Sequence, residues 1–153
     1  MHNNTQVVLI DDDPRRRQVL GTLFVFLEFE CTSLDFVSWF QQFNGKKLPA
    51  EDAVIVLGSS NLPISIEKLL NEFLSVDPNV PVLTLGDWHE SESLNQILSS
   101  MLIAEISEPF VHTQIVSALH KAQVYRQRRQ SADGQLQLWE NHATLFNHLV
   151  GSS

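Results

Sequence analysis

Three consecutive carboxylates, Asp11, Asp12 and Asp13, stand out in this sequence as residues that could do chemistry. They end the apolar run Val7 to Ile10, whose β-branched residues predict a buried strand of a parallel sheet. Ligand sites in open α/β sheets lie just beyond the carboxyl ends of the strands. Carboxylate oxygens in that place are the ligand type that suits a hard cation. The side chains at the carboxyl ends of the other strands therefore decide which function such a site could have.

The apolar pattern of the whole chain alternates between strands and helices. Short apolar runs predict strands at residues 6–10, 29–33, 53–57, 82–85 and 103–106. Apolar residues at helical spacing predict helices at about 14–27, 36–43, 64–74 and 94–101, and from 111 to about 130. Asn44-Gly45 is expected to end the second helix, and Trp39 on it is expected to pack in the core. The alternation predicts an α/β, flavodoxin-like doubly wound sheet of five parallel strands, with helices on both faces and an extended C-terminal helix.

Composition narrows the class of protein. The 153 residues carry a net charge of −8, which argues against direct binding of nucleic acid because phosphate binding needs a concentrated basic surface. No apolar run approaches the roughly 20 residues of a membrane span, so we expect no membrane contact. The lone Cys31 has no partner for an internal disulfide and suits a reducing cytoplasm. We expect a cytoplasmic globular domain in which Cys31 packs as a small apolar residue of a strand.

Three features together resemble bacterial response-regulator receiver domains over about Val7 to Arg126. They are the acidic pair after the first strand, the apolar third strand, and Pro109-Phe110 after the fifth. The resemblance implies that the acidic pair, Asp11 and Asp12, binds Mg²⁺. It also implies an acceptor Asp after the third strand, a Thr or Ser after the fourth, and a Lys before the Pro-Phe pair. Metal and Lys would neutralise charge on the transferring phosphoryl group.

The sequence departs from the receiver pattern at three strand ends. The acceptor position falls on Leu57 or Gly58, the Thr or Ser position falls on Gly86, and Glu108 replaces the Lys. We interpret Asp11, Asp12 and these residues as a degenerate phosphorylation site without catalytic residues.

Two interpretations of the acidic cluster stay open. In one, Asp11 and Asp12 still bind Mg²⁺; in the other, the cluster is a solvated loop in which Asp12 or Asp13 caps the helix that follows. Because the third carboxylate is missing, we expect no cofactor in this fragment. An alternative hypothesis is a receiver that still accepts phosphate on a nonstandard residue, Ser59 or Asp87.

The last helix becomes basic near its end. Lys121, Arg126, Arg128 and Arg129 suit either a solvated last turn or a signalling helix that joins the domain to another one or to a second copy. Residues 131–134, Ser-Ala-Asp-Gly, predict a break or hinge after it. A dimer face on the fourth helix would use Leu94, Ile97, Leu98 and Met101.

The tail refines the resemblance. The run HKAQVYR at His120 to Arg126 and the ending LFNHLVGSS resemble the N-terminal regions of sigma-54-dependent flagellar master regulators of the FleQ and FlrA type. The resemblance implies an atypical receiver-like domain at 1–126, a linker at 127–142, and at 143–153 the start of a truncated AAA+ domain. The ATPase, DNA-binding and cyclic di-GMP sites of such proteins would all lie beyond Ser153.

These observations predict a non-enzymatic, non-phosphorylated regulatory and dimerisation domain of an activator of flagellar genes. Its expected partners are a second copy and the AAA+ and DNA-binding domains of the same protein. An adaptor that docks an antagonist ATPase is the remaining alternative, and it needs no phosphate either.

Overall fold

The computed structural model describes residues 5–43, 53–58, 64–86 and 94–151, with the helical backbone alone for 132–151. The described residues form strands and helices in strict alternation. In chain order they are β1 (Gln6–Ile10), α1 (Pro14–Phe26), β2 (Glu30–Leu34), α2 (Phe36–Phe43), β3 (Val54–Leu57), α3 (Ile66–Val76), β4 (Val82–Leu85), α4 (Gln96–Met101), β5 (Leu102–Ile106) and α5 (His112–Gly151).

The strands form one parallel sheet in the order β2-β1-β3-β4-β5. This is the flavodoxin-like order, so the predicted fold class is confirmed. The predicted strands match the observed ones to within one residue at each end. The predicted end of the second helix, Asn44-Gly45, lies outside the described residues.

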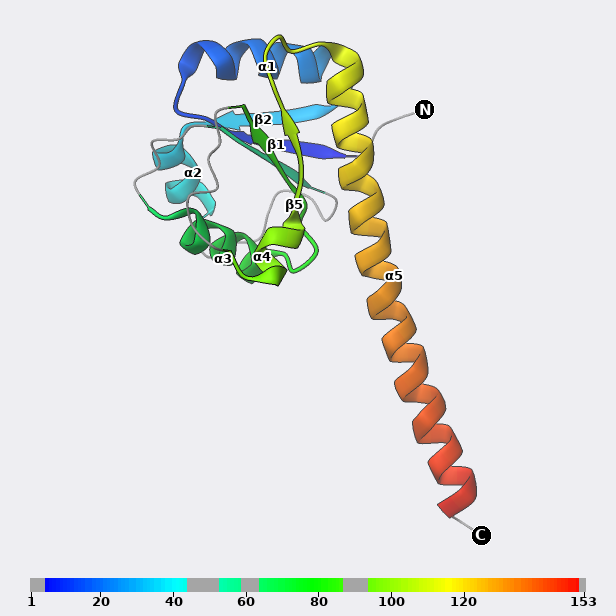
Figure 1. Cartoon of the computed structure of the whole chain (residues 1–153). Coiled ribbons are helices and arrows are strands. Elements are labelled where there is room, and N and C mark those ends of the chain that lie inside the picture. The colour runs from blue at the N-terminus through cyan, green and yellow to red at the C-terminus, as the bar shows by residue number, and fades with distance from the viewer. Residues whose placement is uncertain (1–4, 44–52, 59–63, 87–93, 152–153) are drawn as a thin grey trace.

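Two apolar layers cover the sheet (Figure 1). Helices α1 and α5 pack on one face, against the strand residues of which Val7 and Leu9 are typical. Helices α2, α3 and α4 pack on the other face, against residues such as Val8 and Ile10. Successive residues of β1 therefore serve opposite layers, as the period of two in a strand requires. Trp39 is buried in the second layer and contacts Phe73 edge to face, as predicted.

Helix α1 ends in a Schellman motif. The Phe29 amide donates to Phe24 O at 2.9 Å, and the Glu28 amide donates to Val25 O at 3.0 Å. Phe24 and Phe29 also pack in the same apolar layer, which is the usual hydrophobic contact of this motif. The motif requires a left-handed residue after the cap, and Glu28 occupies that position with φ of 69°. A position that favours glycine therefore carries a side chain.

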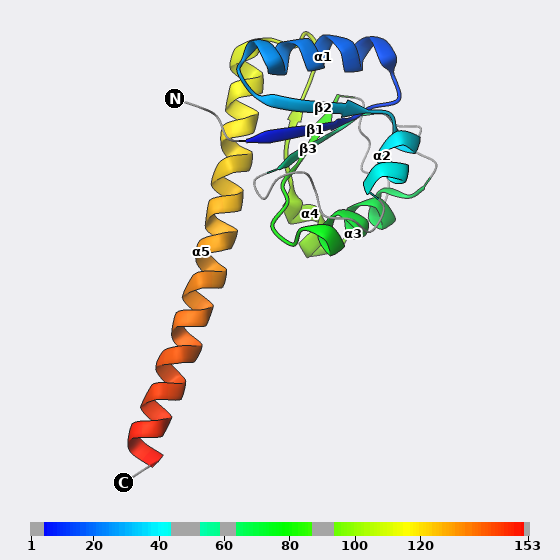
Figure 2. The ribbon, with the colours of Figure 1, turned by 180° about the vertical axis from the view of Figure 1, so that it is seen from behind.

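Helix α5 differs from the sequence prediction. It is one continuous helix of 40 residues, and the predicted break at 131–134 is wrong. Ala and Gln are good helix formers, and a lone glycine costs only about 1 kcal/mol relative to alanine, which is too little to end a helix. The second half of α5 extends far beyond the sheet, as the view from behind shows (Figure 2). Within the part of the chain that the structure describes, no helix is long and apolar enough to cross a membrane.

The strained cap gives a first prediction. Replacing Glu28 by glycine should raise the free energy of unfolding by about 0.5–1 kcal/mol, because the cost of a left-handed side-chain residue exceeds the added entropy of the unfolded chain. Urea denaturation followed by circular dichroism measures the change. The matched control is Glu28→Ala, which removes the carboxylate but keeps the Cβ. An equal gain in both variants would mean that the carboxylate, and not the backbone conformation, is unfavourable.

Candidate functional site

The Asp11 carboxylate lies at the carboxyl end of β1 and is held by an arginine. Asp11 is 1% exposed, and its two oxygens accept from Arg16, at 2.5 Å from Nε and 2.9 Å from Nη2. Asp11 Oδ1 also accepts from the Asp13 amide at 3.0 Å. Arg17 Nη1 donates to the backbone oxygen of Asp11 at 2.7 Å. The two arginines of the first helical turn therefore fix both the carboxylate and its backbone.

Gly58 lies directly beside this carboxylate. The pairing of Ile10 with Leu57 continues with a hydrogen bond from the Gly58 amide to Ile10 O at 2.8 Å. Leu57 is fully buried in the core, so of the two residues expected at the acceptor position only Gly58 lies beside Asp11. A Cβ on Gly58 would stand 2.6 Å from Asp11 Cγ and 2.8 Å from Leu85 Cδ1. The Asp11 side chain thus fills the space that an acceptor side chain would need.

Asp12 and Asp13 hold the two helices that begin near them. Asp13 is the N-cap of α1, and its Oδ1 accepts from the amides of Arg15 and Arg16 at 3.0 and 3.2 Å. Asp12 Oδ1 accepts from the amide of Phe36, the first residue of α2, at 2.9 Å. Of the two capping candidates in the sequence, Asp13 caps α1, whereas Asp12 supports the start of α2, whose N-cap is Asp35.

These contacts do not fit Mg²⁺ at the acidic cluster. Both oxygens of Asp11 are bound by Arg16, a cation that already balances the charge. Among the described residues, no group of three or more His, Cys, Asp or Glu side chains is arranged to hold a metal ion. The alternative acceptors Ser59 and Asp87 lie outside the described residues.

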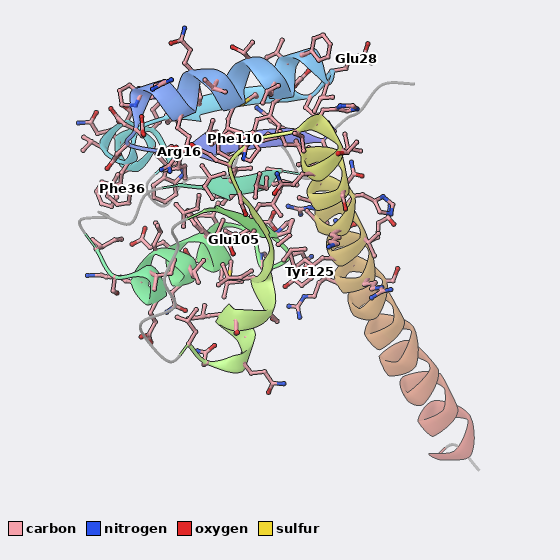
Figure 3. The ribbon with its side chains drawn as sticks, turned by 45° about the horizontal axis from the view of Figure 1, so that its top comes forward. Arg16, Glu28, Phe36, Glu105, Phe110 and Tyr125 are labelled. Atoms are coloured by element: carbon pink, nitrogen blue, oxygen red, sulfur yellow. The ribbon has the colours of Figure 1, made fainter. Side chains whose placement is uncertain are left out.

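The other two strand ends differ in how much room they leave. At Gly86, a Cβ would meet Ser107 Cα at 3.6 Å, an ordinary contact. Glu108 is exposed and lines an open hollow of about 350 Å³ together with Arg15, Arg16, Val19 and Phe110. Figure 3 shows Arg16 and Phe110 at the end of the sheet that faces this hollow. The residue expected to replace the receiver lysine is therefore an exposed carboxylate that lines the same hollow as Arg16.

Three side chains have shifted pKa values with clear causes. The hydrogen bond to Asp11 raises the pKa of the Arg16 guanidinium, and the charges of Asp13 and Glu108 add to this effect. The Ser38 amide and hydroxyl lower the pKa of the Asp35 carboxyl, which caps α2. Burial raises the pKa of the Cys31 thiol to about 11, so this half-buried residue of β2 is a protonated, weakly reactive thiol at neutral pH.

The other predicted site residues separate into buried and exposed groups. Leu98 and Met101 of α4 lie in the core, so they cannot form a dimer face on the folded domain, and Leu94, just before α4, is partly buried against the same layer. Only Ile97 of that set is exposed, at 62%. The helical period explains the error, because the apolar stripe of a short helix is the one that faces the sheet.

The basic residues of α5 separate in the same way. Lys121, Arg128 and Arg129 are exposed, whereas Arg126 is buried and paired with Asp77. The sequence grouped these four residues by charge, and only the packing distinguishes Arg126 from the rest.

Sequence reasoning did not identify Arg16. The run Arg15-Arg16-Arg17 directly follows the three carboxylates, which is the only signal the sequence offers. A separation of five residues across a strand end and a helix start has no fixed geometry, so the pair required a structure. The same holds for Gln114, whose amide group bonds both the amide and the carbonyl of Ser107 and so ties the loop after β5 to α5.

Solved structures of receiver domains share this fold. The response regulator StyR has a TM-score of 0.65 at 20% identity, covering 94% of this chain and 71% of its own. FixJ-N has a TM-score of 0.56 at 19% identity, covering 79% and 94%. A CheY-like receiver domain protein from Methanospirillum hungatei JF-1 has a TM-score of 0.58 at 14% identity, covering 84% and 99%. The chain is therefore a CheY-like receiver domain in its fold.

A family model, described as flagellar regulatory protein FleQ, matches residues 6–124. The match spans most of the chain, so the chain belongs to this family. Family and fold are those of a regulatory domain of a flagellar regulator and not of an enzyme.

The buried ion pair gives a second prediction. Arg16→Gln should lower the free energy of unfolding by about 3 kcal/mol or more, because it leaves the Asp11 carboxylate buried without its cation. The matched control is Arg15→Gln, which removes an exposed arginine from the same helical turn and should cost under about 1 kcal/mol. Chemical denaturation measures both. Equal losses would show that Asp11 does not depend on Arg16.

The two strand-end glycines give a third prediction. Gly58→Ala should destabilise the domain by about 1–3 kcal/mol, because its Cβ would overlap a carboxylate that Arg16 holds in place. Gly86→Ala has room for the same methyl group and should change stability by about 0.5 kcal/mol or less. The difference between the two melting curves is the measurement. A tolerated alanine at Gly58 would mean that the Asp11 side chain moves freely.

Proposed function

We propose that this chain is a non-phosphorylated regulatory and dimerisation domain of a sigma-54-dependent transcription activator that controls flagellar genes. The observation that carries the proposal is the position of the Asp11 carboxylate. It forms an ion pair with Arg16 and lies in the space where a side chain of residue 58 would be. The family and the fold supply the regulatory role.

Phosphoryl transfer to a receiver needs an acceptor carboxylate, a cation and room for the phosphoryl group. Gly58 carries no side chain, and the space above it is filled by Asp11. The guanidinium of Arg16 binds the carboxylate oxygens that would otherwise be available to a metal. Glu108 places a negative charge near this edge, where a phosphoryl group would need a positive one. Each of these features opposes phosphorylation at this edge of the sheet.

Dimerisation is supported by the second half of α5. Its backbone is helical to Gly151, and six of its apolar residues recur at alternating intervals of four and three, with Leu138, Leu145 and Leu149 outside this series. The six positions are Ala132, Leu136, Trp139, Ala143, Phe146 and Val150. On a helix this spacing gives one apolar stripe of the coiled-coil type. We propose that two chains pair along this stripe in parallel, which would hold the segments that follow side by side.

The proposal also makes this chain part of a larger cytoplasmic protein. An AAA+ domain would begin at 143–153, a DNA-binding domain would follow it, and α5 would connect both to the receiver-like domain. Control would then come from a partner or ligand, because the carboxyl edge of the sheet offers no phosphate switch.

A fourth prediction tests the proposed function by sedimentation over a concentration series. The chain should form a concentration-dependent dimer whose dissociation constant is the same with and without Mg²⁺ plus beryllofluoride, a mimic of the acyl phosphate. Leu136→Lys should weaken the dimer by about ten-fold or more, because it places a charge in the apolar stripe. Gln137→Lys adds the same charge outside the stripe and should leave the constant nearly unchanged.

Each part of the proposal has its own contrary outcome. A dimer constant that moves with beryllofluoride would show that the acidic cluster still works with an acceptor elsewhere. A chain that stays monomeric throughout, or one that loses its dimer equally in both lysine variants, would rule out pairing through the stripe.

A further inference from the structure

Arg126 ties α5 to the amino-terminal edge of the sheet. Its side chain is buried, and Nη2 forms an ion pair with Asp77 Oδ2 at 2.9 Å. The same nitrogen donates to the backbone oxygen of Ala53, just before β3. One turn of helix earlier, Gln123 Nε2 donates to Thr5 Oγ1 at 2.7 Å, just before β1. We call Thr5, Ala53, Asp77, Gln123 and Arg126 the exit clamp, because α5 leaves the domain directly after them.

The clamp joins segments that are distant in sequence. Asp77 caps the C-terminus of α3, and its second oxygen accepts from the Asn79 amide at 3.0 Å. Its carboxylate therefore fixes the turn between α3 and β4 with one oxygen and α5 with the other. Tyr125, labelled in Figure 3, packs against the apolar layer of α2, α3 and α4, although most of α5 covers the opposite face. The helix thus contacts both layers at this one level.

The polar contacts leave α5 little freedom where it exits. A buried guanidinium needs its partners, and among the described residues Arg126 Nε has no hydrogen-bond partner, so the Nη2 contacts hold the group. Turning or sliding the helix would separate Arg126 from Asp77 and Ala53 together. The single nitrogen Nη2 serves both oxygens at once, because its two hydrogens are available to Asp77 and to Ala53.

We propose that Arg126 is the residue that positions α5 where this helix leaves the domain. We also propose that regulation reaches α5 through Asp77 and the α3–β4 turn. The carboxyl edge of the sheet is held by the pair of Asp11 and Arg16, whereas the clamp lies at the opposite edge, where α5 leaves. A partner that moved the end of α3 would move Asp77 and release Arg126. The signalling part of this inference rests on the proposed function, and the positioning of α5 does not.

A distance measurement tests the inference, as the fifth prediction. Spin labels are placed by Gln18→Cys on α1 and Gln130→Cys on α5, both exposed, in a Cys31→Ala background. Labelled chain is mixed with an excess of unlabelled chain, so that double electron–electron resonance measures only the distances between two labels on the same chain. The parent should give one narrow distribution. Asp77→Asn and Arg126→Gln should each broaden or shift it, by about two-fold in width.

The controls separate positioning from stability. Asp77→Asn keeps an oxygen for the Asn79 amide and is the deciding variant if Arg126→Gln fails to fold. Glu72→Gln removes a carboxylate from the same helix and should leave the distribution narrow. If Asp77→Asn is folded by circular dichroism and its distribution matches the parent, the clamp does not position α5 and the inference is wrong. That result would leave the proposed function intact, since beryllofluoride and sedimentation test it independently.

Discussion

A carboxylate buried at the end of β1 is the constraint on which the carboxyl edge of this domain depends. Asp11 has almost no contact with water, so its charge must be balanced by a partner within the protein. Arg16 supplies that partner from α1, and the helix must therefore begin at Pro14, with Asp13 as its cap, for the guanidinium to reach back. The same carboxylate lies beside Gly58, so β3 must be followed by a residue without a side chain. One ion pair thus accounts for the residue types after β1, in the first turn of α1 and after β3.

This pair also changes what the receiver fold can do. In a phosphorylated receiver, charge at the carboxyl edge changes when a phosphoryl group arrives, and the fold responds. Here the balancing cation is covalently part of the chain and does not depart. On the proposed function, this edge takes up no phosphoryl group and so would not report a signal by a change of charge. A regulatory role then requires another part of the domain that can adopt two arrangements. The contacts of Arg126 at the opposite edge of the sheet are where α5 leaves the domain.

The sequence was enough to predict the fold because strand and helix patterns are local. The run Val7–Ile10 and its counterparts predicted the strands, and the alternation predicted their parallel order. Site details failed where the answer depended on packing between distant segments. In the sequence, nothing distinguishes Arg126 from Arg128 and Arg129. The structure distinguishes it, because Arg126 forms an ion pair with Asp77, which is distant in sequence. Leu98 and Met101 carried a helical apolar pattern that suits a dimer face and a core equally, and burial decides between them. The break predicted at 131–134 is absent because good helix formers such as Ala132, Gln135 and Leu136 offset the low helix propensity of Gly134.

Helix α5 gives one apolar stripe two different neighbours. Ile115, Ala118, Ala122 and Tyr125 follow the intervals of three and four, and they pack on the domain. The same intervals continue without a change of phase through Arg129 to the apolar positions of the second half. Because a straight helix drifts by about 20° per heptad against this repeat, the face proposed to bind a second copy is rotated around the helix from the face that binds the sheet. Any rotation of α5 at the exit clamp would turn both together. In the proposed dimer, the orientation of the domain about the helix would then determine how the two domains lie relative to each other, which is the reason for proposing the exit clamp as the point of control.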